Sequence, residues 1–110
     1  AGELKHGTIS LIEKGSPVVA IAVDPELFEK TLSNVVEVAT RGASVIAVAS
    51  KSNARVEQKA AHTVFLPDCN PLLAPVLTAV VLQLFGYYVA AAQGLDIDKP
   101  RNLAKSVTVE

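Results

Sequence analysis

The sequence predicts an α/β fold of three layers, in which a mainly parallel sheet is flanked by helices. Residues 17–23 and 44–49 are continuous apolar runs rich in β-branched side chains, and residues 62–66 form a third run that ends at Pro67. Strands that are apolar on both faces are typical of parallel sheets covered by helices. Since helical patterns separate the runs, a three-layer sandwich is the natural architecture.

The segment between the first two runs carries the signals of a helix. Asp24 can cap its amino end, Pro25 suits the first helical position, and Gly42 marks its end. Between them apolar side chains recur at helical spacing: Phe28, Leu32, Val35, Val36 and Ala39. The resulting crossover should be right-handed. A shorter helix is expected over residues 53–61, with its charges on the exposed side: Arg55, Glu57 and Lys59.

Residues 71–93 carry no charged side chain, and the segment is long enough to raise the possibility of a membrane span. Neither a basic cluster nor an aromatic belt flanks it, and Asn70 before Pro71 gives an ordinary helix cap. Four residues interrupt the apolar run: Pro75, Thr78, Gln83 and Gln93. A helix that is apolar all round is typical of a buried position. We therefore expect a helix hidden between the sheet and a second subunit or domain, and no membrane partner.

Length, composition and charge fit one domain or part of one. Of the 110 residues 50% are hydrophobic, and ten basic against eleven acidic side chains give a formal net charge of −1. This balance offers no basic surface for nucleic acid or an anionic membrane. The single cysteine, Cys69, cannot form an intramolecular disulfide, so a cytoplasmic setting is expected. The chain opens without Met in the middle of a motif, which we interpret as an incomplete domain.

The last residues of the chain hold a candidate nucleophile. Lys105 lies among small and β-branched side chains within residues 99–110. A lysine amine attacks a carbonyl only when it is neutral, and desolvation by a closing tail or a nearby cation such as Arg101 favours that form. On composition alone, a solvated and frayed terminal lysine is the simpler interpretation. Arg101 could equally form a surface ion pair with Asp96 or Asp98.

Two motifs carry a resemblance to a known family. Residues 2–7 read Gly-Glu-Leu-Lys-His-Gly, and residues 100–110 read Pro-Arg-Asn-Leu-Ala-Lys-Ser-Val-Thr-Val-Glu. Together they resemble the C-terminal half of the isomerase domain of the glutamine–fructose-6-phosphate aminotransferase family. The terminal motif is highly specific to this family, whereas other sugar isomerase (SIS) domains share the fold without it. The resemblance implies that residues 1–110 are the C-terminal part of a SIS domain, with residues 99–110 as an active-site tail.

The resemblance also implies roles for three residues. Lys105 matches the lysine that forms a Schiff base with C2 of open-chain fructose 6-phosphate, which acidifies the C1 hydrogens. His6 matches the histidine that opens the sugar ring in the active site of the neighbouring subunit, and this implies a homodimer. Ala104 is a candidate substrate-binding residue, because its backbone would lie against the sugar. Arg101 is a second candidate by its position four residues before Lys105, where it could order the tail. Without the resemblance, a near-terminal histidine is more often an exposed residue, although imidazole exchanges protons near neutral pH.

Other candidate chemistries fail on the residues themselves. His62 has no second ligand at metal spacing, and two histidines with one cysteine do not make a zinc site. Cys69 lies between Asp68 and Asn70 with no histidine near it in sequence, so we interpret it as a loop thiol. The chain has no GxGxxG or P-loop motif, which argues against a nucleotide ligand. No metal or other cofactor is expected.

The chain also departs from the family pattern. The family's glutaminase domain and the half of the isomerase domain that holds the sugar phosphate fall outside it, and its carboxylate base would lie before Ala1, so Glu3 is not that base. Thr8 stands where relatives commonly have proline. We therefore expect the parent protein to convert D-fructose 6-phosphate and glutamine into D-glucosamine 6-phosphate and glutamate, and the 110 residues alone to be inactive. The alternative is a non-catalytic SIS-type module that binds a sugar phosphate or dimerises.

Overall fold

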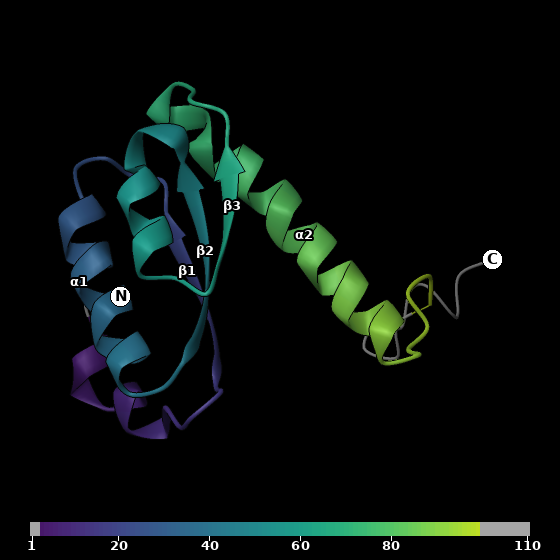
Figure 1. Cartoon of the computed structure of the whole chain (residues 1–110). Helices are drawn as coiled ribbons and strands as arrows, with labels where there is room; N and C mark the ends of the chain where they lie inside the picture. Colours follow the sequence, from purple (N-terminus) through teal and green to yellow (C-terminus); the bar gives the residue numbers. More distant parts are fainter. Residues whose placement is uncertain (1–2, 100–110) are drawn as a thin grey trace. The chain divides into compact units, whose positions relative to one another are not determined.

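A parallel three-stranded sheet forms the centre of the fold (Figure 1). The computed structural model describes residues 3–99. Its strands are β1 (Pro17–Ala22), β2 (Ser44–Ser50) and β3 (His62–Leu66), and they pair in the order β1-β2-β3. All three lie where the sequence predicts them, within one residue at each end. The prediction rested on burial of both strand faces, which leaves a continuous apolar run rather than an alternating pattern.

Helix α1 (Phe28–Thr40) forms the predicted crossover between β1 and β2. The carboxylate of Asp24 accepts hydrogen bonds from the backbone N–H groups of Glu26 and Leu27, at 2.8 and 3.3 Å. These bonds hold a turn, so the α-helix begins three residues later than expected. The side chains that face the sheet recur every three or four residues: Phe28, Leu32, Val35 and Val38. Gly42 ends the crossover with φ 97°, a left-handed conformation that favours glycine.

The connection between β2 and β3 differs from the prediction. An α-helix over residues 53–61 was expected, but the structure has a 3₁₀ helix, η3 (Lys51–Gln58). Asn53 interrupts it with φ −101° and ψ 27°, and its buried side-chain amide donates a hydrogen bond of 2.9 Å to the backbone oxygen of Ala22. A buried amide must be paired. Its partner lies at the end of β1, and this tertiary bond takes precedence over a regular helix.

Replacing Asn53 with leucine should destabilise the fold by about 1–3 kcal/mol, because a buried hydrogen bond is lost and an apolar side chain meets the carbonyl. Urea unfolding measures the change. Gln58→Leu is the matched control, because Gln58 is an exposed amide on the same element and its replacement should stay within about 0.5 kcal/mol. An equal loss for the two variants would contradict the role of the Asn53 amide.

The two faces of the sheet are covered differently. Elements α1 and η3 lie on the same face, where their side chains share one core with the strands, including the fully buried Val45 and Val56. On the opposite face Val19, Ile21 and Val64 stay between 38% and 46% exposed. An apolar sheet face is stable only when another layer packs on it. The partly exposed face is therefore the one on which the third layer of the predicted sandwich would pack.

Helix α2 (Ala74–Ala92) follows a 3₁₀ turn, η4 (Pro71–Leu73). The predicted cap is confirmed, because the side-chain oxygen of Asn70 accepts a 3.0 Å hydrogen bond from the backbone N–H of Leu72. The chain divides after Thr78 into two compact units. In the second unit the structure describes only the rest of α2 and a turn, up to Lys99. One helix cannot bury its own apolar surface.

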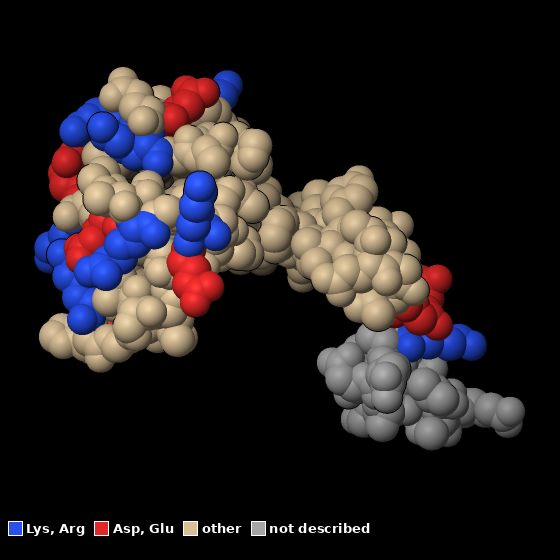
Figure 2. Space-filling view, turned by 60° about the horizontal axis from the view of Figure 1, so that its bottom comes forward, with Lys and Arg blue, Asp and Glu red and all other residues tan. Residues whose placement is uncertain are grey.

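The apolar surface of α2 is exposed in this chain. Figure 2 shows the helix as a tan surface without charged side chains. Residues 71–92 are long and apolar enough to cross a membrane, since an 18-residue window within them has a mean hydropathy of 1.9; 6% of that window is buried. Core helices of soluble proteins reach similar hydropathy but are mostly buried. The predicted cover, a second subunit or domain, is not part of this structure, so the hidden helix stays a prediction.

Candidate active-site residues

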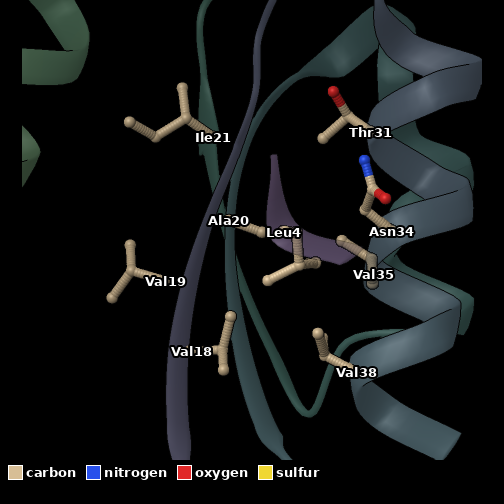
Figure 3. Close-up of a pocket in the computed structure, with 9 residues that line it drawn as sticks. All are labelled: Leu4, Val18, Val19, Ala20, Ile21, Thr31, Asn34, Val35 and Val38. Carbon is tan, nitrogen blue, oxygen red and sulfur yellow. The ribbon is translucent and has the colours of Figure 1, made fainter. Parts of the chain in front are cut away.

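His6 lies on a short helical turn that packs against α1. The 3₁₀ helices η1 (Leu4–His6) and η2 (Thr8–Leu11) precede β1. Leu4 enters a pocket of about 310 Å³ between β1 and α1 (Figure 3), where it meets side chains such as Ala20 and Val35. The ammonium of Lys5 lies 2.7 Å from the carboxylate of Glu37 on α1. These contacts attach the turn to the body of the fold and leave the side chain of His6 exposed.

The turn lies at the amino ends of the strands. Figure 1 shows η1 and η2, in purple, beyond the end of the sheet opposite to the arrowheads. The contact with Glu37 agrees, because Glu37 lies near the end of α1, which leads into the first residue of β2. A six-residue strand spans roughly 20 Å. Ligands of open α/β sheets bind outside the carboxyl ends of the strands. His6 therefore lies at the wrong end to serve a carboxyl-end site on its own sheet.

Polar side chains gather at the carboxyl ends of β2 and β3, a grouping that no sequence motif predicts. The hydroxyls of Ser50 and Ser52 lie 2.9 Å apart, and the carboxylate of Asp68 accepts a 3.2 Å hydrogen bond from the backbone N–H of Ser52. These residues and Cys69 line a pocket of about 210 Å³. The signal in the sequence that could have revealed this group is that polar residues directly follow two buried strands. The hydroxyls can donate hydrogen bonds to a small polar ligand.

The remaining sequence-predicted residues fall into two groups. Arg101, Ala104 and Lys105 lie outside the described residues, so their roles remain predictions. His62 is exposed at the start of β3, and Cys69 is an exposed free thiol in a loop, as predicted. Within residues 3–99 no three histidine, cysteine or carboxylate side chains are grouped as metal ligands.

Comparisons with known proteins agree with the two sequence motifs. The model of the SIS domain family matches residues 1–93. The glutamine–fructose-6-phosphate aminotransferases (isomerizing) of Methanosarcina mazei and Caldanaerobacter subterraneus are 56% and 53% identical to this chain over 110 residues. Each match covers 100% of this chain but 18% of the relative. The chain thus spans less than a fifth of the length of these curated relatives.

A solved structure confirms the fold. The C-terminal domain of glucosamine-fructose-6-phosphate aminotransferase from Francisella tularensis superposes with a TM-score of 0.78 at 37% sequence identity. The superposition covers 87% of this chain and 27% of that one. The similarity therefore extends from the two terminal motifs to the sheet and its helices, and the chain belongs to the SIS domain family.

Proposed function

We propose that this chain is the C-terminal isomerase portion of an enzyme that converts D-fructose 6-phosphate and glutamine into D-glucosamine 6-phosphate and glutamate. The observation that carries the proposal is that all 110 residues, both motifs included, align with relatives named glutamine–fructose-6-phosphate aminotransferase (isomerizing). The rest of such an enzyme would supply the glutaminase domain, the grip on the phosphate and the carboxylate base. The chain alone is therefore inactive, and the complete protein works in the cytoplasm as a homodimer.

The proposed chemistry divides between two residues. His6 donates a proton to the ring oxygen of the cyclic sugar and accepts one from the anomeric hydroxyl, which opens the ring. The neutral amine of Lys105 then adds to the C2 carbonyl, and water leaves with the uptake of one proton, so that an iminium forms and the C1 hydrogens become acidic. Ala104 and Arg101 position the sugar and the tail.

The position of His6 supports its action in a neighbouring subunit. Its turn lies at the amino ends of the strands, whereas a sugar phosphate would bind at the carboxyl ends. An exposed imidazole on the outside of the fold is suited to reach a second copy. A symmetric dimer would exchange two such histidines through one repeated contact.

Trapping the imine tests the proposal directly. The full-length protein that carries this sequence is incubated with fructose 6-phosphate and reduced with borohydride, which converts the iminium into a stable secondary amine. Mass spectrometry should then find the sugar phosphate attached to Lys105. Lys105→Arg is the control, because its guanidinium keeps the charge but forms no such imine, and it should remain unlabelled.

The same experiment distinguishes the alternative function. A non-catalytic SIS-type module would still bind the sugar phosphate, so calorimetry would show binding while borohydride left Lys105 unmodified. That combination would contradict the enzyme proposal and support a sugar-phosphate sensor.

A further inference from the structure

The turn that carries His6 is too short to hold itself in place. Helix η1 has three residues, and in the described part of the chain two local hydrogen bonds hold it: from the N–H of His6 to the oxygen of Glu3 at 3.0 Å, and from the hydroxyl of Thr8 to the oxygen of Leu4 at 3.3 Å. The side chain of Glu3 makes no capping bond. Short 3₁₀ turns gain little from their own hydrogen bonds. The direction of the His6 side chain therefore depends on tertiary contacts made by its neighbours.

Two neighbouring residues provide those contacts. Leu4 is half-buried and packs against the core between β1 and α1 (Figure 3). Lys5 pairs with Glu37 at 2.7 Å, and the second carboxylate oxygen of Glu37 lies 4.0 Å from the guanidinium of Arg41, the residue that directly follows α1. The side chain of Glu37 is 30% exposed, so Arg41 and the helix surface restrict its freedom.

The geometry points to Glu37 as a positioning residue for His6, an inference that rests on the proposed function. Successive side chains of a 3₁₀ helix diverge by about 120°, since it has three residues per turn. Leu4 is held toward the core and Lys5 is held toward α1. The side chain of His6 therefore takes the remaining direction of the turn, which points away from the fold. Glu37 thus acts on the imidazole through Lys5 and never touches the sugar.

The test measures ring opening separately from the later steps. Fructose 6-phosphate closes its ring through O5, so an analogue without the 5-hydroxyl stays open and needs no help from His6. In the full-length protein, Glu37→Gln should lower kcat with fructose 6-phosphate about tenfold, because displacing a catalytic group by 1 Å costs about 100-fold and the untethered turn would be displaced for roughly nine tenths of the time. KM should stay unchanged, as should turnover of the 5-deoxy analogue.

The chain offers a matched control and a conservative rescue. The exposed pair Arg55–Glu29 also ties an element to α1 but makes no contact with the His6 turn, so Glu29→Gln should leave both activities unchanged. Lys5→Met should behave like Glu37→Gln, whereas Lys5→Arg keeps the ion pair and should retain full turnover. Full activity of Glu37→Gln, or an equal loss with both substrates, would overturn the positioning role.

His6→Ala in the same assay separates the two claims. If His6→Ala loses turnover of fructose 6-phosphate while Glu37→Gln does not, only the positioning role fails. If His6→Ala turns over fructose 6-phosphate like the unmodified protein, the ring-opening part of the proposed function fails, and the role of Glu37 with it.

Discussion

Two inactive variants of the full-length protein should restore activity to each other when they share a dimer. One variant carries His6→Ala and the other Lys105→Met. Each alone should be reduced to background, because the first lacks the proton carrier for ring opening, worth about 10²–10⁴ in rate, and the second lacks the amine nucleophile. Co-expression with two different affinity tags gives the mixed dimer.

The expected recovery follows from the exchange of His6 between subunits. In a mixed dimer the subunit with intact Lys105 receives an intact His6 from its partner, so one of its two sites is complete. Random association makes half of the dimers mixed, and total activity should therefore reach about a quarter of the unmodified level. The position of His6 at the amino ends of the strands, away from a carboxyl-end site, is the structural reason to expect this result.

A site formed within one subunit would give a different result. Each subunit of the mixed dimer would then carry one defect, and purified mixed dimers would be as inactive as the parent variants. That result would contradict the proposal that His6 serves a neighbouring subunit. Purified mixed dimers of His6→Ala with Glu29→Gln, which breaks an ion pair away from the His6 turn, keep one complete site under either arrangement and are the positive control for the activity of one site.

The strands were predictable because their cause is local. A strand buried on both faces must be apolar throughout, and the β-branched runs around Val19, Ile46 and Val64 show this in the sequence alone. Element η3 was not predictable in the same way. Asn53 is a polar residue at a plausible helix start, and nothing nearby reveals that its amide binds the oxygen of Ala22, 31 residues earlier. A tertiary partner decided that local structure.

The candidate site shows the same division. The motif around His6 was visible in the sequence, but the pairing of Lys5 with Glu37 joins segments that are distant along the chain. The residues at the carboxyl ends, Ser50 and Ser52, form no motif, and only the parallel arrangement of β2 and β3 brings them beside Asp68. The sequence can therefore identify a reactive residue, whereas its supports depend on the fold.

Replacing Leu84 with glutamate should leave the isolated chain nearly unchanged but destabilise the full-length protein. Leu84 is 50% exposed on α2 in this chain, so the isolated 110 residues should tolerate the charge with a change within about 0.5 kcal/mol. In the full-length protein we expect a second subunit or domain to cover the helix. A carboxylate forced into that contact would cost several kcal/mol and lower the melting temperature by on the order of 5–10 °C, with loss of assembly.

We expect α2 to be covered because the apolar side chains beside Leu84 are exposed in this chain, and exposed surfaces of this kind promote association or aggregation. Leu84→Met is the matched control, since a volume-conserving apolar exchange costs less than about 1.5 kcal/mol. Calorimetry and sedimentation of the full-length variants measure the effect. Melting and assembly of Leu84→Glu equal to those of Leu84→Met would show that no partner covers the helix. Flotation of the unmodified full-length protein with lipid vesicles, and a need for detergent, would instead show that the uncharged segment enters a membrane.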